Sequence, residues 1–219
     1  MIQLKDIKVI SVCLPDDAEW TEKSERAKQY FASEGLDVYW VEGIHAQKWG
    51  IQGRHIYLLD KRPEEQFYFG DKNVGIFLTW YMLFQICKAM THSHYMLMEM
   101  DCRFKDGWKE KLNEELKNVP DDFDFLFVGS CCAEDKEPVH VAGDVYEYPW
   151  RGEEKWDWYP QCGHCYIIAQ KAMQHLINTN RDVANPMDIS LIRYSFEQLK
   201  VYAILPRIAD QGEKTEITL

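Results

Sequence analysis

The sequence predicts a single α/β domain with a mostly parallel central sheet. Three observations lead to this prediction. Short apolar runs typical of buried strands alternate with longer stretches whose apolar residues recur at helical spacing. The 219 residues contain neither an internal repeat nor a linker, and this length suits one domain. The composition, with 46% hydrophobic and 28% charged residues, is that of an ordinary globular protein.

The first elements each have a local signal. Residues 7–13 form an apolar run typical of a buried strand, and residues 19–33 form a helix that stops at Gly35. Residues 37–41 form the next strand, so the chain opens with a βαβ unit and a parallel pair of strands. A long helix over residues 71–90 carries apolar side chains on all its faces, which predicts a buried, central position.

The second half of the chain continues the alternation of strands and helices. Further strands are expected over residues 95–101, 123–128, 165–169 and 201–205, and further helices over residues 106–119, 171–177 and 187–199. Residues 43–70 and 131–161 are expected to be irregular, and long irregular stretches in compact domains usually carry function. The polar tail 210–219 is expected to be frayed, which leaves a domain over residues 1–209.

Charge and cysteine content restrict the expected partners and location. With 25 Lys+Arg against 36 Asp+Glu, the net charge is −11, which disfavours a nucleic-acid partner without excluding a local basic groove. The uncharged run between Lys72 and Lys88 is too short to span a membrane. The chain does not open with an apolar leader, and its seven cysteines are then typical of reduced thiols, so we expect a cytoplasmic protein.

An acid pair ends the strand expected over residues 95–101. If the strand continues, Glu99, Asp101 and Arg103 share one face, because side chains alternate along a strand. Carboxylates at the carboxyl end of a parallel strand can hold Mg²⁺ or Mn²⁺, and the ion can bind a diphosphate. The alternative is a solvated strand end that starts a turn.

The run Cys162-Gly-His-Cys165 permits three interpretations. It matches a thiol-disulfide redox motif, but the residues that follow are typical of a strand rather than of the helix that such chemistry uses. It could supply half of a zinc site, with Cys131 and Cys132 as the other ligands. The third interpretation is that these cysteines pack without a chemical role.

Asp188 stands at the start of an expected helix, after Asn185 and Pro186. An acid there is a candidate general base, although helix capping also explains it. The sequence contains no Gly-x-Gly-x-x-Gly, no P-loop and no Gly-x-Ser-x-Gly. Dehydrogenase, kinase and hydrolase interpretations therefore lose their usual support.

Taken in order, several motifs resemble those of the family 25 glycosyltransferases, which include lipopolysaccharide, lipooligosaccharide and collagen galactosyltransferases. The resemblance covers about residues 7–211 and rests on segments 10–17 with Arg26, 43–46, 73–80, 98–101, 123–129, 163–166 and 186–188, and on Pro206. The acid cluster of the family looks like Met98-Glu-Met-Asp101, and its Pro-Val-Asp looks like Pro186-Met-Asp188.

The resemblance implies a single GT-A-like, Rossmann-like domain that moves a hexose, galactose or glucose, from a nucleotide-diphosphate sugar such as a UDP-sugar to a hydroxyl of a glycan. The reaction would be inverting, with Mn²⁺ or Mg²⁺ held by Glu99 and Asp101 and with Asp188 as the base. The implied donor-binding residues are Pro15, Arg26, His45, Asn73, Thr79 and Arg103, and the implied acceptor-binding residues are Trp156, Trp158, Gly163 and His164. In a metal-independent mode, Arg103 or Lys72 would neutralise the diphosphate.

The chain departs from the family pattern at three places. Met100 replaces the middle Asp of the acid cluster, Thr79-Trp80 replaces a Ser-His pair, and His45 replaces an Asp. Three other functions stay open: a phage-type enzyme that glycosylates a hydroxymethylated DNA base, a non-catalytic carbohydrate-binding or interaction protein with a decayed site, and a thiol-disulfide oxidoreductase using Cys162 and Cys165.

The eight tryptophans divide into two groups. Those within expected helices or strands are explained by packing, namely Trp20, Trp40, Trp80 and Trp108. Those within the expected irregular stretches could stack on a sugar, namely Trp49, Trp150, Trp156 and Trp158.

Overall fold

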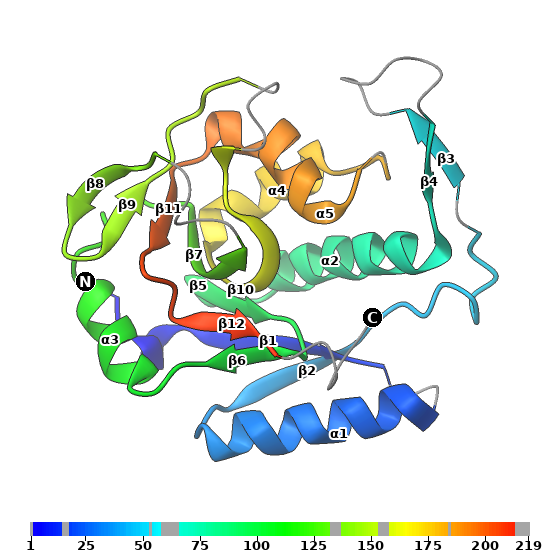
Figure 1. Ribbon diagram of the computed structural model, residues 1–219, viewed down its shortest axis with the longest axis horizontal. Helices are drawn as coiled ribbons and strands as arrows, with labels where there is room; N and C mark the ends of the chain where they lie inside the picture. The colour runs from blue at the N-terminus through cyan, green and yellow to red at the C-terminus, as the bar shows by residue number, and fades with distance from the viewer. Residues whose placement is uncertain are drawn as a thin grey trace.

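The computed structural model describes residues 2–14, 18–52, 54–57, 66–131, 137–152, 158–183 and 185–212. It confirms the α/β class and the mostly parallel central sheet (Figure 1). The main path of the sheet has the order β2-β1-β5-β10-β7-β11-β9-β8. These strands are β1 Lys8–Cys13, β2 Val38–Glu42, β5 His94–Met98, β7 Phe125–Cys131, β8 Val139–Ala142, β9 Val145–Glu147, β10 Gln161–Ala169 and β11 Val201–Ile204.

Strand directions give the sheet its mostly parallel character. β1 pairs in parallel with both β2 and β5, and β11 pairs in parallel with β7. β10 is antiparallel to both of its neighbours, β5 and β7. Consequently β2, β1, β5, β7 and β11 all point one way, and β10 runs against them. The predicted βαβ opening is confirmed, because α1 (Ala18–Ser33) connects the parallel strands β1 and β2.

The sheet separates two hydrophobic cores. In β5, Tyr95 and Leu97 pack in one core together with α2 (Asp71–Ala89), α4 (Met173–Thr179) and α5 (Met187–Ser190). The alternate residues Met96 and Met98 pack in the other core, with α1 and α3 (Trp108–Glu115). Figure 1 shows these two sets of helices on opposite faces of the sheet. The period-2 alternation of a strand therefore supplies both cores at once.

Several expectations about regular structure were wrong. The first irregular stretch contains an antiparallel hairpin of β3 (Arg54–Tyr57) and β4 (Gln66–Phe69). The second contains β8 and β9, which extend the sheet beyond β11. The helix expected over residues 187–199 is α5 followed by a π-helical turn and a 3-10 turn, Leu191–Ser195 and Phe196–Gln198. Two further 3-10 turns span Leu4–Asp6 and Gln170–Ala172.

The chain is also ordered beyond the domain end expected at residue 209. Strand β12 (Ala209–Gln211) pairs antiparallel with β6 (Cys102–Phe104) and touches β7 in parallel register. The close approach to β7 depends on Gly129, because a Cβ there would lie 2.7 Å from the backbone oxygen of Ala209. The end of the described chain is therefore a structural part of the domain. None of the described helices is long and apolar enough to cross a membrane.

Candidate functional site

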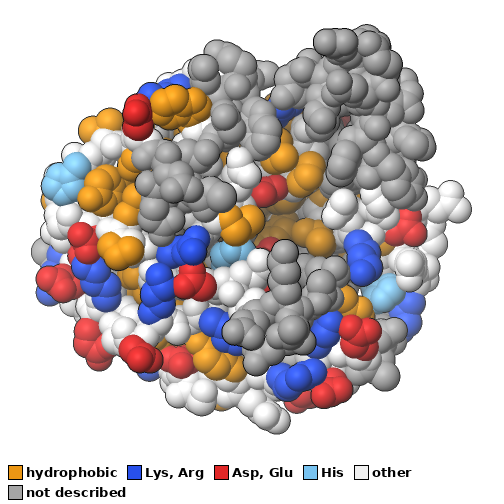
Figure 2. Space-filling model, viewed as in Figure 1, with side chains coloured by type: hydrophobic (Ala, Val, Ile, Leu, Met, Phe, Trp, Pro, Cys, Tyr) orange, Lys and Arg blue, Asp and Glu red, His pale blue; other side chains and the backbone are white. Residues whose placement is uncertain are grey.

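A pocket of about 320 Å³ lies where the carboxyl ends of β1 and β5 meet the start of α2. Its walls come from the end of β1, the first turn of α1, the segment after β2, one side of α2 and the turn after β5, and they include Leu14, Trp20, His45, Thr79, Glu99 and Asp101. In the space-filling view, acidic and hydrophobic side chains meet in a hollow near the middle of this face (Figure 2). Carboxyl ends of parallel strands are where α/β sheets bind ligands.

The acid pair occupies a turn rather than a strand. β5 ends at Met98, and the amide of Cys102 donates to the backbone oxygen of Glu99 at 3.1 Å, which closes the turn. The expectation that Glu99, Asp101 and Arg103 share one strand face was therefore wrong. The turn nevertheless places Glu99 and Asp101 in the pocket wall, whereas Arg103 is not part of it.

Asp101 is almost completely buried, with 2% of its surface exposed. Its Oδ2 accepts a hydrogen bond of 2.7 Å from the side-chain amide of Gln211 on β12. Its Oδ1 is buried and has no hydrogen-bond partner within the described parts of the chain. A buried carboxylate oxygen without a partner is unfavourable, and a bound cation would compensate for it.

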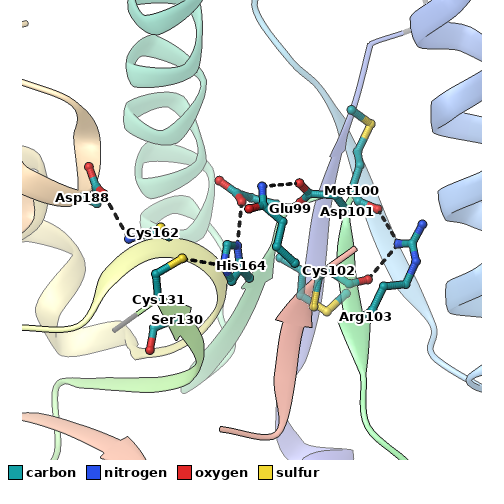
Figure 3. A network of polar contacts seen from close by, with 12 residues as sticks. Glu99, Met100, Asp101, Cys102, Arg103, Ser130, Cys131, Cys162, His164 and Asp188 are labelled. Carbon is teal, nitrogen blue, oxygen red and sulfur yellow. Dashed lines mark hydrogen bonds and ion pairs between the residues drawn. The ribbon is translucent and has the colours of Figure 1, made fainter. Parts of the chain in front are cut away.

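Glu99 contacts a buried histidine on the neighbouring strand. Its Oε2 lies 3.3 Å from Nδ1 of His164, and the Nε2 of that ring lies 3.4 Å from Sγ of Cys131 (Figure 3). Burial raises the pKa of Glu99. Burial lowers the pKa of His164, but hydrogen bonds with Cys131 and Glu99 outweigh this and raise it to about 10. Ligand atoms of Glu99, Asp101 and His164 all lie within 4.8 Å of one another, so the set could hold a metal ion.

Two of the predicted donor-binding residues lie in the pocket wall. His45 and Thr79 are both part of it. Thr79 Oγ1 donates to the backbone oxygen of Gly75 at 2.7 Å and accepts from the amide of Ile44 at 2.9 Å. The hydroxyl of Thr79 therefore fixes the segment after β2 against α2.

Of the other predicted donor-binding residues, Arg26, Asn73 and Arg103 do not line the pocket. Arg26 pairs with Glu22 at 3.3 Å on α1, and the side chain of Asn73 is not in the wall. Arg103 donates to the backbone oxygens of Met100 and Cys102 and lies over the ring of Tyr30. The structure thus gives Arg103 a role in holding the acidic turn. Pro15 lies outside the described residues.

Asp188 lies on the far side of His164 from Asp101 (Figure 3). Its Oδ2 accepts from the amide of Cys162 at 3.1 Å, and its Oδ1 accepts from the amide of Ile189 at 2.9 Å. It is not part of the pocket wall. These contacts tie the start of α5 to the start of β10.

The predicted acceptor-binding residues are divided between two places. Gly163 and His164 are buried in β10, beside Glu99. A Cβ on Gly163 would lie 2.4 Å from the hydroxyl of Tyr166, so the strand requires glycine there. Trp158 is half-buried, and the guanidinium carbon of Arg151 lies over its ring, 4.5 Å from the ring centre. Trp156 lies outside the described residues.

The two cysteines of the Cys-x-x-Cys run face different surroundings. Cys165 is fully buried in the core beneath α1 and contacts Cys102. Cys162 is half-buried and interacts with Cys131, and this contact raises its pKa. The same contact lowers the pKa of Cys131 to about 5, with help from His164. The run lies in a strand, and its two thiols interact with two different cysteines rather than with each other. Both observations argue against the redox interpretation.

Comparisons with known proteins show distant likenesses only. No family model and no curated protein matches the chain. A glycosyltransferase involved in the glycosylation of the major capsid of PBCV-1 is 10% identical, with 94% of this chain and 81% of that chain covered at a TM-score of 0.46. The inositol-1-phosphate CTP transferase from T. maritima is 10% identical, with 97% and 92% covered at a TM-score of 0.46. A CMP:2-keto-3-deoxy-manno-octonic acid synthetase complexed with CTP is also 10% identical, with 94% and 90% covered at a TM-score of 0.41.

These likenesses are too weak to decide the fold family or the chemistry of the chain. The resemblance to family 25 glycosyltransferases accordingly stays a prediction.

Sequence reasoning missed several residues of the site. Trp20 and Trp80 were assigned to packing, yet both line the pocket, and Trp80 also packs on Tyr166. Gln211 was placed in a frayed tail, yet it holds Asp101. A usable signal existed for Trp20, because an aromatic residue in the first helical turn after a strand lies at the carboxyl edge of the sheet.

Proposed function

We propose that this protein is a glycosyltransferase that binds a nucleotide-diphosphate sugar, such as a UDP-hexose, in the pocket beside Glu99 and Asp101 and transfers the sugar to a hydroxyl acceptor, a glycan. The observation that carries the proposal concerns Oδ1 of Asp101. It is buried without a partner among the described residues, next to a second carboxylate in a pocket at the carboxyl ends of parallel strands. Such a pair has the ligand chemistry of a divalent cation, and cations of this kind bind diphosphates.

The residues present fit Mn²⁺ or Mg²⁺. Glu99 and Asp101 would supply hard oxygen ligands. Nδ1 of His164, 3.3 Å from Oε2 of Glu99, would hold the Glu99 carboxylate in place. When bound, the ion would supply Lewis-acid stabilisation of the diphosphate leaving group. Lys72 in the same pocket adds a positive charge, and it would take over neutralisation in a metal-independent reaction.

The apolar part of the pocket fits a nucleoside. Leu14 and Trp20 line the same pocket as the carboxylates, and His45 lies in the segment after β2. An indole ring offers a stacking surface for a base, and an imidazole offers one hydrogen-bond donor or acceptor. The donor would therefore lie with its base on Trp20 and its diphosphate at Asp101.

An inverting reaction needs a base for the acceptor hydroxyl. Asp188 is the proposed base. Each of its oxygens accepts one amide hydrogen bond and retains a further lone pair. The acceptor would then approach from the side of Cys162 and His164. Gly163, Trp158 and Trp156, which are close to these residues in the sequence, stay the other proposed acceptor-binding residues.

Release of UDP from UDP-galactose or UDP-glucose, with Mn²⁺ and with water or a glycan as acceptor, tests the proposal. We expect release by the wild type and a fall of at least about tenfold for Asp101→Asn and Glu99→Gln, since each removes one charged ligand. The exposed neighbour Asp106 gives a matched control, Asp106→Asn, which should keep full activity. If no nucleotide sugar is consumed by the wild type, the transferase proposal fails, and tight binding without release would indicate a non-catalytic carbohydrate-binding protein.

The charge distribution weighs against a DNA acceptor. On the face that carries the pocket, Lys and Arg side chains alternate with Asp and Glu side chains among the described residues (Figure 2). Together with the net charge of −11, this is the opposite of a basic nucleic-acid surface.

A further inference from the structure

Next to the acidic turn, two strands bring together a second group of possible metal ligands of a different chemical kind. Cys131 ends β7, and Cys162 and His164 lie at the start of β10. The ligand atoms of these three residues all lie within 4.8 Å of one another. We propose that Sγ of Cys131, Sγ of Cys162 and Nε2 of His164 form a site for zinc or a zinc-like soft divalent cation.

The distance between the ring and the thiol fits such an ion. Sγ of Cys131 lies 3.4 Å from Nε2 of His164. In a tetrahedral centre with Zn–S of about 2.3 Å and Zn–N of about 2.0 Å, those two ligand atoms would be about 3.5 Å apart. The pair is therefore already spaced as a tetrahedral ion requires, without a change of backbone.

The backbone of β10 explains why Cys162 and His164 reach the same side. Cys162 has a φ of 61°, a left-handed conformation that is uncommon for a residue with a side chain. The register of β10 against β7 shifts between Gln161 and Cys165. The hydroxyl of Tyr166 donates to the backbone oxygen of Cys162 at 2.8 Å and holds this bulge. Bulges commonly redirect side chains at functional sites.

Glu99 would orient the histidine from outside the site. Its Oε2 lies 3.3 Å from Nδ1 of His164. A metal-binding imidazole usually gives its other N–H to a carboxylate, and this contact leaves the lone pair of Nε2 directed at the metal. The same Glu99 thus faces the pocket and supports the sulfur site, so the two sites would share a wall.

Charge balance makes the site compatible with its partial burial. In the bound state both cysteines would be thiolates and the imidazole would be neutral, with its one proton on Nδ1, and any proton on Nε2 or on sulfur would be released to solvent. Two thiolates and one divalent cation give a net charge of zero. Cys131 and Cys162 are half-buried, which leaves a path for the ion. Three protein ligands leave a fourth position for water or a substrate oxygen.

The ligand set differs from the one that the Cys-x-x-Cys spacing suggests. Cys165 is fully buried and contacts Cys102 in the core beneath α1. It therefore cannot join Cys162 around one ion without rearrangement of β10. This difference supplies the sharpest test, because it predicts which cysteine is dispensable.

The test is a titration of the reduced, metal-free full-length protein with Co²⁺, followed by displacement with Zn²⁺. The wild type should bind one ion with a thiolate-to-cobalt charge-transfer band, and Cys131→Ser, Cys162→Ser and His164→Gln should each weaken binding by at least about tenfold. Cys13→Ser, at a half-buried thiol outside the cluster, and Cys165→Ala should keep the band. Circular dichroism establishes that each variant is folded.

Two results would overturn the inference: no charge-transfer band in the wild type, or loss of the band in Cys165→Ala with retention in Cys131→Ser. The outcome is independent of the transferase proposal. Asp101→Asn removes the negative charge of the proposed oxygen ligand. It should leave the sulfur-to-cobalt band in place, whereas it should lower UDP release by at least about tenfold.

Discussion

The side-chain amide of Gln211 donates a hydrogen bond of 2.7 Å to Oδ2 of Asp101, across 110 positions of sequence. This contact uses one oxygen of the carboxylate and leaves the other, Oδ1, buried without a partner in the described parts of the chain. The amide of Gly212 also donates to the backbone oxygen of Asp101 at 2.7 Å. The end of the described chain therefore sets the orientation of the carboxylate that the proposed function depends on.

Replacing Gln211 should disturb both stability and the site. In Gln211→Leu, Oδ2 of Asp101 loses its hydrogen bond from Gln211, which costs about 1–3 kcal/mol of unfolding free energy. Mn²⁺ binding should weaken as well, because the carboxylate is no longer held. Urea denaturation and Mn²⁺ titration measure the two effects. Gln198→Leu, at an exposed glutamine, is the control, and equal stability of the two variants would show that the Asp101 contact is unimportant.

Gly75 should resist the substitution that usually stabilises a helix. Exposed Gly→Ala changes within helices stabilise by about 1 kcal/mol. At Gly75 of α2 the added Cβ would lie 2.7 Å from the backbone oxygen of Ile44, in the segment that carries His45. We expect Gly75→Ala to lower the melting temperature and to weaken nucleotide binding. Gln85→Ala, at an exposed position of the same helix, should change neither. A more stable Gly75→Ala variant with intact binding would contradict the packing described.

Trp20 should contribute to nucleotide affinity, whereas Trp40 should not. Both indoles are half-buried in the core that includes α1, but only Trp20 lines the pocket. If a base stacks on Trp20, its loss removes about 1–3 kcal/mol. Trp20→Leu should therefore raise the Kd for UDP by about 5–150-fold. Trp40→Leu provides the matched control, and similar Kd values for both variants would exclude stacking on Trp20.

Glu115 makes stability depend on acid pH. Burial raises the pKa of Glu115, but hydrogen bonds from Lys111 and Asn118 and from the amide of Asp144 outweigh this and lower it. A lowered folded-state pKa adds stability above the unfolded-state pKa, and this stability is lost as pH falls through the folded-state value. Unfolding free energy measured against pH should fall in that acid range, and less steeply in Glu115→Gln. The exposed neighbour variant Glu114→Gln should follow the wild-type curve.

The sequence predicted the elements whose residues alternate or cluster by hydrophobicity. Ile10, Leu97 and Phe127, in three of the predicted strands, are fully or almost fully buried, so the apolar runs around them were informative. The acid pair was found because the end of such a strand marks the ligand edge of the sheet. The geometry of the acid pair could not be predicted. The turn after Met98 depends on a backbone hydrogen bond from Cys102 to Glu99, and such a bond has no recognisable sequence pattern.

What could not be predicted depends on contacts distant in sequence. Strand β12 is short and polar. It forms because Gly129 leaves room for Ala209 and because the side chain of Gln211 donates a hydrogen bond to Asp101. The bulge at Cys162 changes which cysteine accompanies His164, and spacing alone cannot show a bulge. Long-range pairing of this kind is fixed by the assembled sheet rather than by local propensity.

The most direct test of the central claim is a calorimetric titration of the wild type and of Asp101→Asn with UDP-galactose, with Mn²⁺ and with a chelator. The account predicts binding by the wild type that depends on Mn²⁺ and is at least about tenfold weaker in Asp101→Asn. Equal affinity of both proteins, or equal affinity with and without Mn²⁺, would contradict the assignment of Asp101 to a metal-bound diphosphate.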